Sequence, residues 1–351
     1  MSTTAPATPT PVVSTDPVRS APSDGATRRA VVIAVLVVAL VGLTLASAGF
    51  GAVALSPTTV LDGLLGGAQS FIVQQYRMPR IGVAVLAGAM LALAGVFLQS
   101  AVRNVLASPD VVGVTKGAGL GAMVATVLTP PAVLWLAVPL GVVAGAALVT
   151  VLLLGIAKIV GSRGATLALV GIAIAALAGA AIQYLMVVYP SYADQAMVWL
   201  AGSVYGSTPN DVVFLAIWAT CCVPLIIVCA SRLDLAAFDD DTQGSLGVAP
   251  ASNRALFVVT AVVLSAGAVV AVGGIGFLGL LAPHLARLLV GARARWLVPA
   301  AALLGAALLV LADLTGRIIA LPNEIPAGIV AAIAGGPYLL FLLLREARRH
   351  G

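Results

Sequence analysis

Long uncharged apolar stretches alternate with short polar breaks along most of this chain. The stretch 81–102 carries no charged residue and lies between Arg80 and Arg103. About 20 apolar residues, each adding a helical rise of about 1.5 Å, match a hydrocarbon core about 30 Å thick. The pattern therefore predicts a transmembrane helix in this segment.

The same pattern recurs, with Pro, Gly and charge clusters between the repeats. It predicts an all-α fold, a polytopic membrane helix bundle of about ten transmembrane helices. The predicted spans lie near 30–54, 80–102, 111–129, 133–156, 166–189, 211–230, 255–272, 275–291, 296–315 and 327–344. Composition agrees, because 61% of the residues are hydrophobic, 9% are charged and the mean hydropathy is +1.12. So much apolar surface requires lipid around it.

The two ends of the chain differ from its centre. Residues 1–27 are rich in Ser, Thr, Pro and Ala, and we expect a disordered cytoplasmic tail because they offer little apolar surface to offset chain entropy. Residues 28–346 form the predicted transmembrane domain, and 347–351 a short cytoplasmic tail. The first apolar run follows a long polar segment, which indicates a retained helix rather than a cleavable signal.

The distribution of Lys and Arg predicts the orientation, because these residues are retained on the cytoplasmic side. With a cytoplasmic N-terminus, all but three of the 18 basic residues fall on that side or at its edge, Lys116 among them, and both termini are cytoplasmic. Arg77, Arg80 and Arg317 remain outside. The pI of 9.4 follows from this asymmetry and does not indicate nucleic-acid binding.

The longest charged insertion between spans is the segment 231–254, which the topology places in the cytoplasm. It contains four of the 13 acidic residues. Asp239, Asp240 and Asp241 favour the start of a short helix, and Leu246-Gly247 its end. Such a helix would suit docking of a soluble partner, and a solvated loop is the equal alternative.

Small residues recur four positions apart within the spans, as in Gly117 and Gly121 or Gly141 and Gly145. This spacing lets helix backbones approach closely in lipid, where no hydrophobic force drives helices together. We expect a compact bundle in which nearly all of these glycines serve packing.

Several motifs follow one another in a fixed order from the second predicted span to the C-terminus. They are Arg77-Met78-Pro79-Arg80, Gly88-Ala89, Gln99, Arg103-Asn104-Val105-Leu106-Ala107, Gly113, Asp239-Asp240-Asp241-Thr242, Leu246-Gly247, Gly274-Ile275-Gly276-Phe277-Leu278-Gly279-Leu280, Pro283-His284, Arg287, Ala312-Asp313, Arg317 and Glu324-Ile325-Pro326-Ala327-Gly328. Together they resemble the FecCD-type permeases of ABC importers for iron siderophores and cobalamin, the type II importers, over about residues 30–345. The stretches 108–113, 239–242 and 335–346 look most similar to the second permease subunit of ferric enterobactin importers.

The resemblance implies a permease subunit that moves a ferric siderophore, with catecholates among the candidates, across the bacterial inner membrane. Expected partners are a second permease, with a heterodimer favoured over a homodimer, two ATP-binding subunits and an extracytoplasmic substrate-binding protein. Haem or cobalamin import is the alternative within the family. The chain has no G-x-x-x-x-G-K-[ST] loop to hold nucleotide phosphates, so ATP hydrolysis is expected in the partner subunits. No catalytic residue, metal site or cofactor is expected.

An ion-coupled secondary transporter is the alternative from a different class. Such a protein would need charged residues at mid-membrane as a coupling relay. None of the predicted spans has Asp or Glu at its middle.

The resemblance also implies roles for the three outer arginines. Arg77, Arg80 and Arg317 correspond to basic residues that receive acidic side chains of the binding protein, a task that suits the bidentate guanidinium group. Anchoring at the interface by snorkelling is the alternative. For the neighbouring Asp313 and Glu324, charge pairing within the chain and binding-protein docking are equally expected.

Two further groups of residues receive implied roles. The segment 236–249 corresponds to the coupling helix that fits a groove on the ATPase, and its Gln243 replaces a residue that is usually a small Ala. The predicted coupling residues are Asp239, Asp240, Asp241, Thr242, Leu246 and Gly247. Gln99, Gln183 and Tyr184 are the candidates for lining the translocation path, and interhelical hydrogen bonds are the equal alternative for each.

Overall fold

The computed structural model describes residues 24–51, 55–160, 164–320 and 323–350, and all of its regular elements are helical. The prediction of an all-α membrane bundle is confirmed. The main helices are α1 (Asp24–Gly49), α2 (Pro57–Leu64), the π-helical turn η1 (Ile72–Arg77), α3 (Met78–Val102), α4 (Val114–Leu128), α5 (Leu134–Val160), α6 (Gly164–Val188), α7 (Ala193–Ala201), α8 (Pro209–Leu233), α9 (Asp240–Ser245), α10 (Pro250–Val272), α11 (Leu278–Val290), α12 (Ala294–Ile319) and α13 (Ala327–His350). Short 3₁₀ turns occur at Pro131–Val133, Pro190–Tyr192 and Leu235–Ala237.

Each predicted span corresponds to a helix, but the helices differ in length. Among the described residues, seven helices are long and apolar enough to cross a membrane, and α4, α11 and the apolar part of α13 are shorter. The predicted tail 1–27 is too long, because residues 24–27 already belong to α1, while 1–23 lie outside the described residues. At the other end, 347–350 continue α13, and residue 351 lies outside the described residues.

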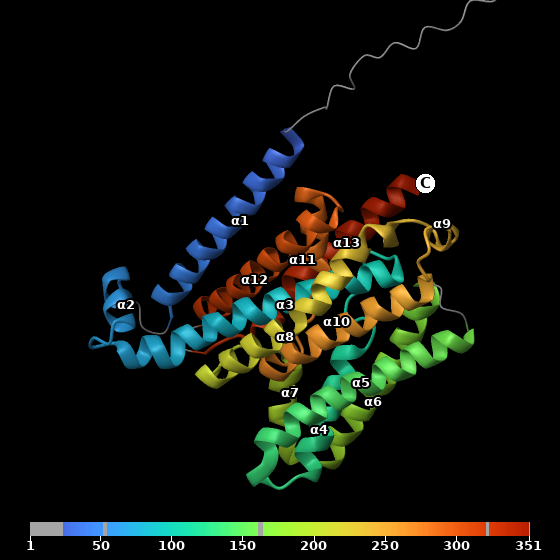
Figure 1. The fold of residues 1–351 in the computed structure, drawn as a ribbon. Coiled ribbons are helices and arrows are strands. Elements are labelled where there is room, and N and C mark those ends of the chain that lie inside the picture. The colour runs from blue at the N-terminus through green and yellow to red at the C-terminus, as the bar shows by residue number, and fades with distance from the viewer. Residues whose placement is uncertain (1–23, 52–54, 161–163, 321–322, 351) are drawn as a thin grey trace, which may run out of the picture.

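Helix α3 forms the centre of the bundle, with α8, α10, α11 and α12 packed around it (Figure 1). In the most apolar 18-residue stretch of Ser70–Val102, the segment that contains α3, 78% of the residues are buried. The corresponding value is 6% for α1, which lies against the side of the bundle. Helices α4, α5 and α6 form a second group of neighbours. The short helix α9 lies at one end of the bundle, which we call the α9 end.

Glycines allow the helices of this bundle to touch backbone to backbone. A Cβ atom added to Gly88 of α3 would lie 2.4 Å from the carbonyl oxygen of Gly305 in α12. The four predicted packing glycines also meet, because a Cβ on Gly121 of α4 would lie 1.9 Å from the carbonyl oxygen of Gly141 in α5. These contacts confirm the packing role expected from the four-residue spacing.

Helix α4 begins half-way along its two neighbours instead of at the end of the bundle. After α3 ends, residues 103–113 turn back into the bundle, and Gly113, with φ +87°, begins α4 against Ala175 near the middle of α6. One turn later, Gly117 packs on Gly145 near the middle of α5. The expectation that Lys116 lies at the edge of the membrane is therefore wrong. The hydropathy pattern did not reveal the position of Lys116, because the returning segment 103–113 has the composition of an ordinary polar loop.

The glycine contacts predict a position-specific loss of stability. Changing Gly121→Ala should lower the free energy of unfolding by about 1–3 kcal/mol, because the methyl group forces α4 and α5 apart. The matched control is Gly155→Ala in α5, where a Cβ would meet no atom within 4 Å. Thermal unfolding of the detergent-solubilised protein measures both. Equal melting temperatures for the two variants would contradict this account of the helix contact.

Candidate functional site

Five charged residues gather at the end of the bundle opposite α9, and we call them the arginine cluster: Arg77, Arg80, Asp313, Arg317 and Glu324. Arg80 of α3 approaches both carboxylates, with its Nη2 2.6 Å from Asp313 and its Nη1 2.8 Å from Glu324. Arg317, one turn beyond Asp313 in α12, completes the network at 2.9 Å. Asp313 therefore lies between two guanidinium groups, and its side chain is only 4% exposed.

The other contacts of the cluster hold the end of α1. Arg317 donates to the carbonyl oxygens of Ser47 and Phe50, at 3.3 and 3.2 Å, and Arg77 donates to that of Ala48. The last carbonyl groups of a helix have no partner within it and carry the negative end of the helix dipole. Two arginines thus supply both the hydrogen bonds and the compensating charge for this terminus.

The arginine cluster is mostly an internal structure. Arg77 and Arg317 are 7% and 4% exposed, and the Arg80 side chain is 12% exposed. Of the two roles expected for Asp313 and Glu324, charge pairing is what the structure shows. Docking of a binding protein on these arginines stays a prediction, and any partner would first meet the Arg80–Glu324 edge, where Glu324 is 27% exposed.

The acidic segment forms the short helix expected from its sequence. Asp239 is the N-cap of α9, and its carboxylate accepts the N–H of Thr242. The helix ends at Ser245 with Leu246 as its C-cap, and Gly247 takes up φ +77°, a left-handed conformation that glycine adopts without strain. Helix formation by 240–245 and its predicted limits are confirmed.

Asp240 fastens α9 to two long helices. One carboxylate oxygen lies 2.8 Å from Arg103 at the end of α3, and the other accepts a hydrogen bond from Arg254 in the first turns of α10. The hydrogen bond from Arg254 holds the pKa of Asp240 below its ordinary value, and the charges of Arg254 and Arg103 lower it further. Because the pKa is lowered in the folded protein, the stabilisation from this link is complete at pH values above the ordinary pKa of 3.8. It is lost as the pH falls through the lower pKa of the folded protein. The link is therefore intact at neutral pH.

Further hydrogen bonds fix the rest of this segment. Gln243 is 3% exposed, and its Nε2 donates to the carbonyl oxygen of Phe238 at 2.9 Å. Its longer side chain thus fills a structural position where the family resemblance led us to expect Ala. Asp234 accepts the N–H of Ala294 at 2.8 Å and so joins the start of the segment to α12. Asp241 and Leu246 remain exposed.

The three candidates for the translocation path lie in two different environments. Gln99 is 3% exposed and forms interhelical hydrogen bonds, donating to the carbonyl oxygen of Gly279 at 3.3 Å and accepting from Arg287. For this residue the interhelical alternative is the one the structure shows. Gln183 and Tyr184 are exposed on α6, Tyr184 by 66%, and their role stays a prediction.

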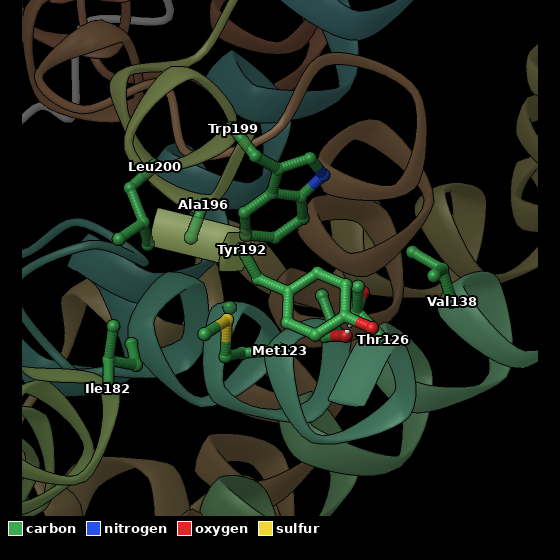
Figure 2. Close-up of a pocket in the computed structure, with 10 residues that line it drawn as sticks. Met123, Thr126, Val138, Ile182, Tyr192, Ala196, Trp199 and Leu200 are labelled. Carbon is green, nitrogen blue, oxygen red and sulfur yellow. Dashed lines mark hydrogen bonds between the residues drawn. The ribbon is translucent and has the colours of Figure 1, made fainter. Parts of the chain in front are cut away.

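Among the described residues, no group of three His, Cys, Asp or Glu side chains is close enough to bind a metal ion. A small cavity of about 70 Å³ lies between α4, α5, α6 and α7. Figure 2 shows the rings of Tyr192 and Trp199 beside the Met123 and Thr126 side chains of α4 in this cavity.

Sequence reasoning missed two connections that define these sites. It placed Asp313 beside Arg317 but not between Arg80 and Arg317, and it did not pair Asp240 with Arg103 and Arg254. The opposite charges were visible in the sequence, and only the packing of α3 against α10 and α12 brings them together.

The helical architecture, the α9 segment and the arginine cluster can be compared with known proteins. The FecCD transport family matches residues 35–345 of the chain. The chain belongs to this family. The FecCD relatives include the Fe(3+)-citrate import system permease protein YfmE of Bacillus subtilis, which is 46% identical over 90% of this chain and 96% of its own length.

Two further comparisons agree with this assignment. The ferric enterobactin transport system permease protein FepG of Escherichia coli is 36% identical over 85% of this chain and 91% of its own length. A solved structure of a metal-chelate type ABC transporter in an inward-facing conformation has a TM-score of 0.79 and 28% identity, and the match covers 90% of this chain and 99% of that one. The FecCD resemblance expected from the motifs is confirmed, and identity to the citrate permease exceeds that to the enterobactin permease.

The arginine cluster predicts a large loss of stability on removal of its central carboxylate. Changing Asp313→Asn should destabilise the folded protein by about 3–5 kcal/mol, because it leaves two buried guanidinium groups without their shared counter-charge. The control Glu324→Gln removes a more exposed carboxylate and should cost under about 1 kcal/mol. Thermal unfolding in detergent compares the two. A stable Asp313→Asn variant would contradict the central position of this group.

Proposed function

We propose that this FecCD protein is a permease subunit of an ABC importer that moves ferric chelates across the bacterial inner membrane. The assignment draws on the family match along residues 35–345 and on the helices that are able to cross a membrane. In this proposal a second permease completes the path, with a heterodimer favoured and a homodimer as the alternative. Two ATP-binding subunits attach at the α9 end, in the cytoplasm with both termini, and an extracytoplasmic binding protein approaches the opposite end.

The observation that carries the mechanism is the attachment of α9 through Asp240. Because Arg103 ends α3 and Arg254 lies in α10, a force on α9 reaches the two helices that meet in the core. Movement of an ATPase surface against the exposed Asp241 and Leu246 would therefore displace the core helices, instead of bending a loose loop. The rigid link converts a change in the ATPase into a change in the path.

The substrate in this proposal is a ferric chelate with negatively charged oxygen donors. The names of the relatives specify ferric citrate for YfmE and ferric enterobactin for FepG. The higher identity to YfmE favours a carboxylate chelate over the catecholate expected from the motifs. Haem and cobalamin remain the alternative substrates within the family.

An ion-coupled transporter receives less support, although the bundle does contain charges that the span pattern did not reveal. Asp313 is buried within α12, but two arginines neutralise it. A coupling relay needs a group that binds and releases an ion during transport, and a carboxylate held by two buried guanidinium groups is unsuited to that task.

The coupling role of Asp240 predicts a transport defect without a folding defect. Asp240→Asn should lower ATP-driven uptake of the ferric chelate by roughly two- to thirtyfold. This range corresponds to a change of about 0.5–2 kcal/mol in the coupling free energy between the ATPase and the path. Stability should change little, because the Asp240 side chain is 46% exposed. Uptake of ⁵⁵Fe-citrate and ATPase activity are measured together in proteoliposomes containing the complete transporter.

The control is Asp62→Asn, which removes an exposed carboxylate of α2, far from α9 (Figure 1), and leaves the links to Arg103 and Arg254 in place. It should transport at the wild-type rate. Equal transport by the two variants would refute the mechanical role of Asp240. Failure of the wild-type transporter to move ferric citrate, ferric enterobactin or any other ferric chelate would refute the proposed substrate class.

Docking of the binding protein is proposed at the exposed edge of the arginine cluster. Arg80 reaches Glu324 at 2.8 Å and lies 5.7 Å from the centre of the Tyr205 ring, which is 71% exposed. An acidic side chain of the binding protein would compete with Glu324 for the same guanidinium group. Arg77 and Arg317 would help to fix the position of this edge. Both hydrogen-bond to the end of α1, and Arg317 also forms an ion pair with Asp313.

This arrangement predicts opposite effects of two substitutions on binding-protein affinity. Glu324→Gln should tighten the complex several-fold, because it frees Arg80 for the incoming carboxylate, and Arg80→Gln should weaken it by about tenfold or more. Surface plasmon resonance with the permease complex in nanodiscs measures both, and melting temperatures identify any misfolded variant. Weaker binding by Glu324→Gln would show that Glu324 contacts the partner itself.

A further inference from the structure

Lys116 occupies an unusual position for an exposed charge. It belongs to the first turn of α4, which lies against Gly145 near the middle of α5 and Ala175 near the middle of α6. Both neighbours belong to helices long enough to cross the membrane. Lys116 is exposed in the single chain, and its Nζ lies 3.7 Å from the point that a Cβ on Gly179 would occupy.

Lipid is an unsuitable environment for this ammonium group. Half of a hydrocarbon core is about 15 Å thick, well beyond the reach of the four-carbon lysine stem from the middle of the bilayer. Ionisable groups at this depth face a water-filled cavity or another protein surface. The face of α4 that carries Lys116 must therefore be turned away from lipid in the assembled transporter.

The same face of α4 also lines a cavity. Lys116, Gly119, Met123 and Thr126 follow one another at spacings of three and four residues, so they share a face of α4. The last three line the cavity of Figure 2, together with Tyr192 and Trp199. Lys116 lies one turn further along, where α6 presents Gly179 one turn from Ile182, another lining residue.

A carboxylate from another segment lies near Lys116. Asp110 belongs to the returning segment 103–113, and its Oδ2 lies 3.0 Å from the point that a Cβ on Gly276 would occupy. Within the described residues, the half-buried Asp110 side chain makes no hydrogen bond or ion pair, and Lys116 is the positive charge that acts on it through space. The two charges are thus near each other without being bonded.

We propose that Lys116 is a transit site in the translocation path, where its ammonium group contacts the anionic oxygen atoms of a ferric carboxylate chelate. This inference rests on the proposed function and adds the part of the path that meets the substrate. Asp110 keeps the contact weak, because its negative charge attracts the ammonium group and repels the chelate. A weak site suits transport, since a tightly held chelate would not leave.

The first test compares ⁵⁵Fe-citrate uptake by the complete reconstituted transporter with substitutions at Lys116. Lys116→Gln should lower uptake at subsaturating chelate by about tenfold, through loss of a charge-assisted contact, and Lys116→Arg should retain most of it. The control Lys158→Gln changes an exposed lysine at the far end of α5 and should transport normally. Normal uptake by Lys116→Gln would overturn the proposal.

A second test asks whether water reaches this position, independently of transport. Lys116→Cys is prepared with Cys221, Cys222 and Cys229 replaced by Ser, and the assembled transporter is treated with sulfonatoethyl methanethiosulfonate. We expect rapid labelling that excess ferric citrate slows. The control Val151→Cys, at an exposed apolar position near the middle of α5, should remain unlabelled.

The two tests separate the possible failures. Absence of labelling at position 116 in a correctly assembled transporter would overturn the proposed path position, whatever the substrate. Labelling combined with no uptake of any ferric chelate by the wild type would instead overturn the proposed function while leaving Lys116 in a water-filled path. Labelling that ferric citrate does not slow would overturn the chelate contact.

Discussion

Direct contact between helix backbones is the constraint on which the rest of this structure depends. Lipid provides no hydrophobic force between helices, so dispersion contacts between closely packed backbones must hold the bundle together. Gly88 meets Gly305, Gly95 meets Gly279, and two pairs of glycines join α4 to α5. Because α3 takes part in the first two contacts, its position determines where its charged ends lie.

The polar groups of the protein depend on this packing. Arg80 and Asp313 face each other because Gly88 and Gly305 bring α3 against α12, and the shared carboxylate then holds Arg317 beside the last carbonyls of α1. At the α9 end, Arg103 and Arg254 meet Asp240 because α3 also packs against α10. The same central helix thus connects the proposed docking edge with the proposed coupling helix.

The ion pairs at the two ends of the bundle differ in how deeply they are buried. The arginine cluster is buried, so its ions are costly to expose and the removal of one partner leaves an uncompensated charge. The Asp240 link is partly exposed and contributes little to stability, but its geometry joins three elements. A rigid end and a surface link are both consistent with a protein that transmits movement from a soluble partner to a membrane path.

The class of fold, the approximate position of every long helix and the limits of α9 follow from the sequence alone. These features depend on local properties, namely uninterrupted apolar length, an Asp at an N-cap and a Gly after a helix end. The ordered motifs of residues 77–328 also sufficed to indicate the FecCD family.

The contacts of the charged residues, in contrast, depend on how distant helices pack against one another. Arg80 and Asp313 are separated by 233 positions, and no local pattern reveals that they share an ion pair or that Arg77 and Arg317 are buried against α1. The depth of Lys116 was likewise hidden, because a segment that returns into the bundle and a segment that remains outside have similar polarity. Hydropathy reports how much apolar length is available, and packing decides where the polar groups between the helices finally lie.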